Sequence, residues 1–146
     1  MKLVQYPHVD KTDVSWNRFG KLYRMTKLIV GVFGTSSKQG KYTLQLMLRK
    51  RFVQMGYNIG QIGTEPSALL FGMDYVFPMG YNSTVSIHEY DTITYLNNAI
   101  HNMEIAGKDI IIVGSQSGTV TYDYGNLQQF AVNQYSYLLG TLPELI

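Results

Sequence analysis

One stretch constrains the fold more than any other: an apolar run that leads directly into a glycine-containing loop and then into a helical pattern. The run "KLIVGVF", residues 27–33, is rich in β-branched side chains, as is typical of a strand buried on both faces. The loop "GTSSKQGKYT" follows it at residues 34–43. Apolar residues then recur at three- to four-residue spacing and predict one face of a helix that ends before Gly56. These residues are Leu44, Met47, Leu48, Phe52 and Met55.

The rest of the chain repeats the alternation of strand and helix. "YNIGQIG" at residues 57–63 predicts a second strand, and residues 63–88 predict a long loop with a short helix near 67–71. Asp91 is the predicted cap of a second helix that ends at Gly107. The expected buried face of this helix holds Ile93, Leu96, Ile100 and Met103.

A third buried strand is predicted in "KDIIIVGSQSGT" at residues 108–119, followed by a final helix capped by Asn126. Its expected apolar residues are Leu127, Phe130, Ala131, Tyr135, Leu138 and Leu139. The order strand, helix, strand, helix, strand, helix predicts an α/β fold, a three-layer parallel sheet with helices on its faces. We expect an irregular leader over residues 1–26 and one α/β domain over 27–146.

Composition narrows the classes of partner. The net charge of +2 over 146 residues is too small to indicate nucleic acid or an anionic membrane as the main partner. The absence of cysteine excludes disulfides, thiolate zinc sites and cysteine nucleophiles. No apolar run approaches the ~18 residues of a membrane span, so we expect a cytoplasmic protein. Twelve tyrosines and seven methionines indicate interface-forming surface and predict a homo-oligomer.

The loop after the first strand has the chemistry of a phosphate site. Backbone N–H groups at a helix amino end attract an anion, a lysine neutralises terminal phosphates, and a hydroxyl can bind magnesium. Lys41 and Thr43 are the candidates for the last two roles. The spacing is a Walker A variant, because five residues separate Gly34 from Gly40 and Tyr42 separates Lys41 from Thr43. An ordinary strand-to-helix turn is the alternative. The predicted phosphate-binding residues are Gly34, Thr35, Ser36, Ser37, Lys38, Gln39, Gly40, Lys41, Tyr42 and Thr43.

These residues also carry a resemblance. "GVFGTSSKQGKYTLQL" resembles the loop of the dethiobiotin synthetase and cobyrinic acid diamide synthase group of P-loop proteins. "DIIIVGSQSGTVTYDYGNLQQFAVNQYSYLLGTLPELI" is similar to a branch that includes proteins described as D-glutamate N-acetyltransferases. "GTSSKQGKYTLQLMLRKRF", "QIGTEPSALLFGMDYVFPMGYNST" and "IIIVGSQSGTVTYDYGNL" look most like a clostridial-type family encoded with peptide maturation systems. The resemblance covers about residues 27 to 146.

The resemblance implies ATP or another nucleoside triphosphate with Mg²⁺, used for activation or transfer in peptide maturation. A peptide or small amino-acid substrate is the implied partner. One alternative is an acyl-CoA-dependent N-acyltransferase, and another is a non-catalytic scaffold that binds a partner. Two departures matter. Gly114 stands where the wider branch usually has a glutamate, which predicts slow hydrolysis. The chain also ends at "LPELI", where a further strand is implied, so we expect a domain truncated at its C-terminus.

A few polar residues outside the loop are further candidates. Glu65 and Asp74 lie in the long loop and are predicted to join Thr43 around the metal, although both also suit turns. Gln116 follows the third strand and is a predicted catalytic residue beside Lys41, placed to orient water or substrate. Alternatively, Gln116 bonds only to the turn backbone. The three histidines, His8, His88 and His101, lack metal-ligand spacing.

Overall fold

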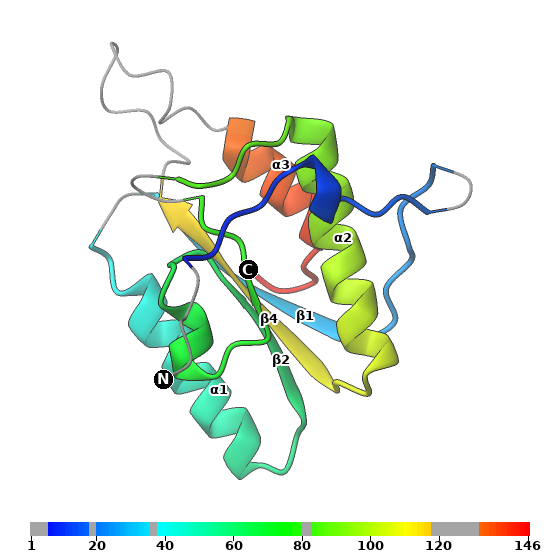
Figure 1. Cartoon of the computed structure of the whole chain (residues 1–146). Coiled ribbons are helices and arrows are strands. Elements are labelled where there is room, and N and C mark those ends of the chain that lie inside the picture. Colours follow the sequence, from blue (N-terminus) through cyan, green and yellow to red (C-terminus); the bar gives the residue numbers. More distant parts are fainter. Residues whose placement is uncertain (1–5, 18–19, 36–37, 80–82, 118–131) are drawn as a thin grey trace, which may run out of the picture.

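A four-stranded parallel sheet forms the middle of the molecule. The structure, a computed structural model, describes residues 6–17, 20–35, 38–79, 83–117 and 132–146. The strands are β1 (Leu28–Gly34), β2 (Ile59–Gly63), β3 (Tyr75–Val76) and β4 (Ile110–Ser117). Their order is β1-β4-β2-β3, and every pair is parallel. Ile110 opens β4 and pairs with both Leu28 of β1 and Ile59 of β2. The amino ends of these three strands are therefore aligned across the sheet (Figure 1).

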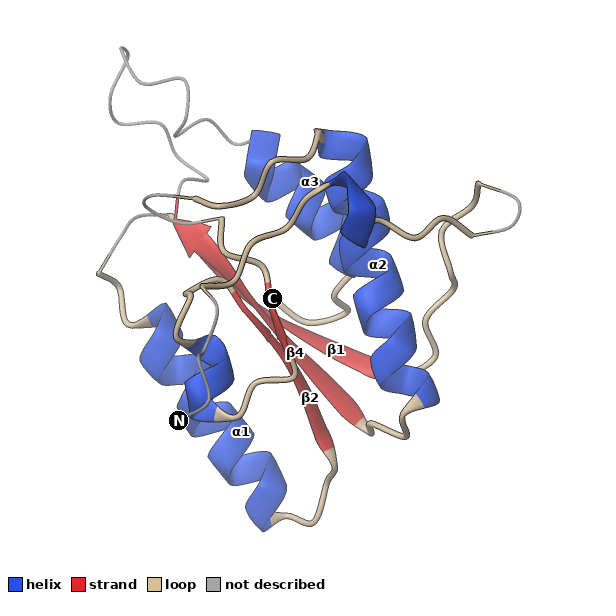
Figure 2. Cartoon of the chain, in the orientation of Figure 1, coloured by secondary structure: helices blue, strands red, loops and turns tan. Residues whose placement is uncertain are grey.

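Helices cover both faces of this sheet (Figure 2). On one face lies α1 (Lys41–Gln54), whose Leu48 and Phe52 pack on a cluster that includes Val30 and Ile112. The other face carries α2 (Glu89–Ile105) and α3 (Val132–Thr141). Alternate β4 residues face opposite ways, because Ile111 and Val113 belong to the second, larger cluster. The predicted three-layer α/β fold is therefore confirmed.

Most predicted elements exist, with shifts at their ends. α1 ends just before Gly56, which has a φ of 92°, and α2 ends before Gly107, which has a φ of 79°, as predicted. Asp91 is not a cap, because α2 begins at Glu89 with His88 before it. The short helix in the long loop is the 3-10 turn η2 (Ala68–Phe71), and the two-residue strand β3 was not predicted. The predicted cap Asn126, with Leu127, Phe130 and Ala131, lies outside the described residues.

The buried faces of two helices differ from the prediction. In α1, Leu44 is 48% exposed and Met47 is 64% exposed, whereas Gln45 is buried and only 2% exposed. In α3, Tyr135 and Leu139 are exposed, whereas Tyr137 is fully buried. Close helix packing explains the second case: a Cβ on Gly140 would lie 2.8 Å from the carbonyl oxygen of Ile93 in α2. The small residue allows this approach, and Tyr137 then points into the core.

The leader packs against the domain. Val9 is buried in the larger core cluster and forms a parallel bridge with Val85. The side chain of Asn97 in α2 accepts a hydrogen bond from the backbone N–H of Tyr23 at 2.7 Å and donates one to its carbonyl at 3.1 Å. The Tyr23 ring also stacks on His101 with 3.8 Å between centroids. The described leader residues therefore pack on the same core as the rest of the domain. The leader also contains the 3-10 turn η1 (Lys11–Asp13).

The segment after α3 runs beside the outer edge of β1. Leu145 forms a parallel bridge with Val30, and its carbonyl accepts a hydrogen bond from Gly31 N–H at 2.7 Å. The Glu144 side chain accepts a hydrogen bond from Ile29 N–H at 2.7 Å. The chain thus adds a short stretch of pairing where the resemblance implies a strand.

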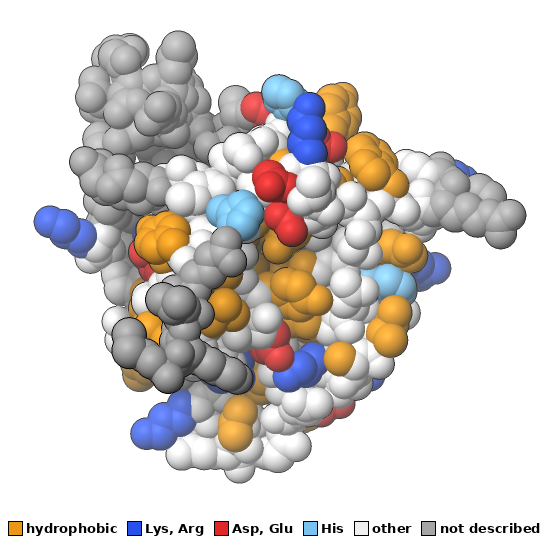
Figure 3. Space-filling view, in the orientation of Figure 1, with side chains coloured by type: hydrophobic (Ala, Val, Ile, Leu, Met, Phe, Trp, Pro, Cys, Tyr) orange, Lys and Arg blue, Asp and Glu red, His pale blue; other side chains and the backbone are white. Residues whose placement is uncertain are grey.

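The outer surface is of mixed character. Acidic and basic side chains are interspersed with polar and apolar ones over the face drawn in Figure 3. Among the described helices, none combines the length and apolar character needed to cross a membrane.

Candidate functional site

The carboxyl ends of β1, β2 and β4 meet beside the amino end of α1 (Figure 1). A pocket of about 420 Å³ lies at this edge of the sheet. Ligands of open parallel sheets gather at this position. The residues that line the pocket are Lys38, Gln39, Gly40, Lys41, Tyr42, Gln45, Thr64, Glu65, Ser115 and Gln116.

The loop before α1 has the backbone conformation of a tight turn onto a helix. Gly40 is the N-cap and has a left-handed φ of 83°, which a residue with a side chain adopts only with strain. The Gly40 carbonyl accepts the first helical hydrogen bond, from Leu44 N–H at 2.9 Å. The Gln39 side chain donates to the Thr35 hydroxyl at 3.0 Å and so ties the two ends of the loop together. The helix amino end therefore borders the pocket, as anion binding requires. Ser36 and Ser37 lie outside the described residues.

Lys41 provides a cation at the pocket. Burial lowers the pKa of the Lys41 ammonium below its ordinary value, and the Glu65 carboxylate partly opposes this shift. Partial removal of a cation from water strengthens its attraction to an anion that shares the pocket. Lys41 therefore gives this pocket a partly buried cation that attracts anions.

Glu65 and Gln116 are held together across the pocket. The Gln116 side-chain amide donates to the Thr64 hydroxyl and to the Glu65 carboxylate, both at 3.0 Å. The Gln116 carbonyl accepts hydrogen bonds from the Ser115 hydroxyl at 3.0 Å and from the Gln134 side chain. Gln116 lines the pocket, and the contacts of its side-chain amide are to protein groups.

Only one of the three predicted metal ligands reaches the pocket. Glu65 lines it, whereas Thr43 is exposed and is not a lining residue. Successive helix residues are rotated by about 100°. Because Tyr42 follows Lys41, Thr43 therefore turns away. The described part of the chain holds no cluster of three or more His, Asp or Glu residues able to hold a metal ion.

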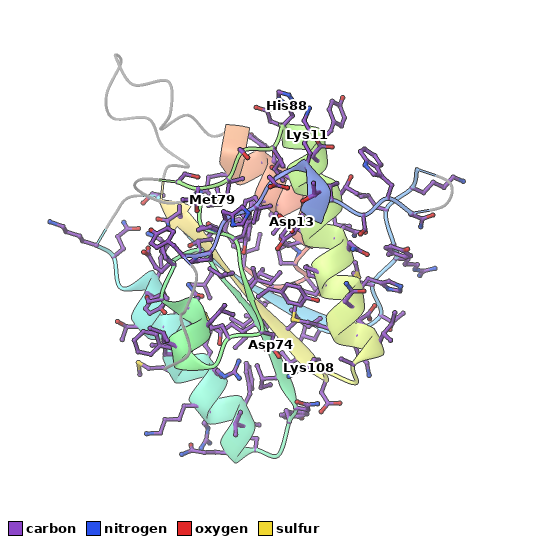
Figure 4. All side chains as sticks on the ribbon, in the orientation of Figure 1. Lys11, Asp13, Asp74, Met79, His88 and Lys108 are labelled. Atoms are coloured by element: carbon purple, nitrogen blue, oxygen red, sulfur yellow. The ribbon has the colours of Figure 1, made fainter. Side chains whose placement is uncertain are left out.

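Asp74 has a structural environment instead. Its carboxylate lies 2.8 Å from Lys108 Nζ and 3.6 Å from Arg49 Nη1, and it accepts a hydrogen bond from Gln61 N–H at 2.9 Å (Figure 4). Lys108 also donates to the carbonyl of Ile59, which opens β2. This ion pair therefore lies toward the amino ends of the strands, away from the pocket. Asp74 is therefore not among the residues that line the pocket, and its expected role beside the metal stays a prediction.

Comparison with known protein families bears on this loop. Residues 18–144 match a family described as "Domain of unknown function (DUF1611_C) P-loop domain". The chain belongs to this DUF1611 family. No curated protein sequence matches the chain. Family membership therefore establishes a P-loop domain and leaves its substrate to be argued from the site.

In this DUF1611 P-loop domain, the pocket contains residues that sequence reasoning missed. Thr64 directly follows β2, and Ser115 lies near the carboxyl end of β4, so the rule that selected Gln116 also applies to them. Gln45 lies one helical turn after Lys41, and that spacing places both on one face of α1. Gln45 was not predicted as a pocket residue, because the apolar spacing of the helix predicted a different buried face.

The site also accounts for Gly114. A Cβ at position 114 would overlap the side-chain amide of Gln45. A glutamate at this position would therefore displace Gln45 from the pocket wall. In this chain the space beside Gly114 is filled by an amide from α1.

Proposed function

We propose that this domain binds the phosphates of a nucleoside triphosphate, ATP or another, at the pocket before α1. The observation that carries the proposal is the place of Lys41. It starts α1 behind a left-handed Gly40 and lines a pocket at the carboxyl ends of three parallel strands. A helix amino end and a lysine together provide the dipole and the charge that a polyphosphate needs.

Magnesium fits this pocket through a single carboxylate. Mg²⁺ keeps several waters and is commonly held by one or two carboxylates together with substrate phosphates. Glu65 is the pocket residue that would hold it, with the Thr64 hydroxyl nearby. Bound magnesium supplies charge neutralisation at the phosphates. Because Glu65 is shared with Gln116, we propose that the domain holds a nucleotide better than it hydrolyses one.

The resemblance to peptide maturation families supplies the finer proposal. In that setting the bound nucleotide serves activation or transfer on a peptide or a small amino acid. The lining groups of the pocket are mostly polar and few of them are charged, which supports a polar substrate of this kind. The expected homo-oligomer belongs to this same proposal.

The test is calorimetric binding of MgATP, MgADP and acetyl-CoA to the parent chain, to Lys41→Met and to Lys50→Met. Lys50 is exposed on the same helix, so its substitution makes the same charge change away from the pocket. A charge-assisted hydrogen bond contributes ~1.5–3 kcal/mol. We therefore expect Lys41→Met to weaken MgATP binding at least ~10-fold, and Lys50→Met to bind as the parent does.

Other outcomes choose between the alternatives. Tight binding of acetyl-CoA without MgATP binding would favour the N-acyltransferase reading. Binding of none of the three ligands would favour a scaffold and overturn the proposal. Equal losses of MgATP affinity in both lysine variants would show that the overall charge of the protein, and not the place of Lys41, determines binding.

A further inference from the structure

We infer that Gln45 is the neutral hydrogen-bond donor that positions the bound phosphate group, and that Gly114 is a glycine because Gln45 needs its space. This inference rests on the proposed phosphate binding and names a positioning residue for it. Gln45 lies in the second turn of α1, one turn after Lys41, and lines the same pocket.

The burial of Gln45 calls for a function. Its side chain is 2% exposed on a helix whose Leu44 and Met47 are left in solvent. Burying an amide costs free energy unless its hydrogen bonds are made, whereas burying either neighbour would stabilise the fold. The fold therefore places a polar group at this wall in preference to the available apolar ones.

Gly114 is the matching half of this arrangement. The side-chain amide of Gln45 lies where a Cβ on residue 114 would project. Gly114 itself sits in β4, directly before Ser115 and Gln116 of the same strand, which line the pocket. Even an alanine at position 114 would force the Gln45 amide to move.

Neighbouring groups set the orientation of the Gln45 amide. Arg49 has only donors, and its Nη1 donates to Gln61 Oε1 at 3.3 Å. The Gln61 NH₂ group is therefore the end that faces Gln45, and it approaches Gln45 Oε1 at 3.5 Å. Because the oxygen of Gln45 is turned toward Gln61, its NH₂ group is the end left for a ligand in the pocket. Arg49 is held in turn by Asp74 at 3.6 Å.

A donor is the group that a phosphate oxygen needs. The other two side-chain amides of the pocket already donate to protein groups: Gln39 to Thr35, and Gln116 to Thr64 and Glu65. Gln45 thus adds a neutral donor beside the cation of Lys41, without a second positive charge. Gln61 and Arg49 do not contact the phosphate in this proposal. They are positioning residues, because they orient the Gln45 amide.

The experiment measures MgATP, MgADP and pyrophosphate binding by calorimetry for Gln45→Met, Gln45→Glu and Gly114→Ala. Gln54→Glu is the control for charge on the same helix, because Gln54 is exposed at the far end of α1. We expect Gln45→Met to lose about tenfold in affinity, the contribution of roughly one hydrogen bond. Gln45→Glu should lose more, because a carboxylate repels phosphate. Gln54→Glu should bind as the parent does.

Gly114→Ala approaches the same contact from the strand. It should weaken binding to a similar degree, and combining it with Gln45→Met should add little further loss. A packing role alone predicts the opposite: Gln45→Met would keep full affinity, and that result would overturn the inference. Full affinity in Gly114→Ala would overturn the link to Gly114. A parent that binds none of the probes would overturn the proposed function itself, and the inference with it.

Discussion

The side chain of Lys41 bends back over Gly34, so that a Cβ at position 34 would lie 2.6 Å from Lys41 Cδ. Gly34 is the last residue of β1 and Lys41 is the first residue of α1. The glycine therefore serves a close approach between the strand end and the lysine. The path of the lysine over the strand end depends on the absence of a side chain at position 34.

Gly34→Ala should weaken MgATP binding several-fold, because the new methyl group must push Lys41 from its path. The stability of the fold should change less than the affinity, since residue 34 is only partly buried. Calorimetry of Gly34→Ala, Lys41→Met and the double variant checks this. Losses that add fully in the double variant would show that the two residues act independently.

Glu65→Gln should have opposite effects with and without magnesium. Removing the carboxylate lowers repulsion of a free polyphosphate, so Mg²⁺-free ATP should bind about as tightly or more tightly. The gain in affinity on adding Mg²⁺ should shrink several-fold, because Glu65 is the proposed metal ligand of the pocket. Titrations with Mg²⁺ and with EDTA give the two values. An unchanged magnesium effect would remove Glu65 from the metal site.

Asp74→Asn should affect stability more than metal dependence. It removes one charge from a pair with Lys108 and Arg49, both of which are largely buried side chains. Loss of one partner leaves buried cations uncompensated, so we expect a cost of roughly 1–3 kcal/mol in unfolding free energy. Thr43→Ala is the comparison, and it should leave both stability and magnesium dependence near those of the parent. A large loss of the magnesium effect in either variant would restore the metal role expected from the sequence.

Glu104→Gln should produce a stability difference that depends on pH. Burial alone would raise the pKa of Glu104, but hydrogen bonds from Thr26 and Lys27 outweigh it, so the net pKa lies below the ordinary value of 4.5. A lowered folded pKa stabilises the protein above pH 4.5, and this contribution is lost as pH falls through the folded pKa. Parent and variant should therefore differ by about 1 kcal/mol at pH 7 and converge in acid. Denaturant titrations between pH 3 and pH 7, spanning roughly this window, measure the difference. A constant difference across that range would contradict it.

Sequence reasoning located the elements well where the pattern was long and periodic. The runs "KLIVGVF" and "KDIIIVGSQSGT" became β1 and β4, and Gly56 and Gly107 follow the ends of α1 and α2 as expected. These features depend on local properties: β-branched side chains favour extended backbone, and glycine permits a left-handed residue after a helix. The lysine and glycines of the loop were found for the same local reason.

Which faces are buried was decided by tertiary contacts. Leu44 and Met47 carry the apolar pattern of α1, but Gln45 and Arg49 turn inward because Gly114, Gln61 and Asp74 lie opposite them. Local periodicity contains no information about what a neighbouring strand offers. Asp74 shows the same limit, since its partner Lys108 is remote in sequence and meets it only through the sheet. The sequence by itself therefore determined the strand–loop–helix unit that carries the proposed phosphate site. The folded sheet decided that Glu65 and Gln45, and not Asp74 and Thr43, line the pocket.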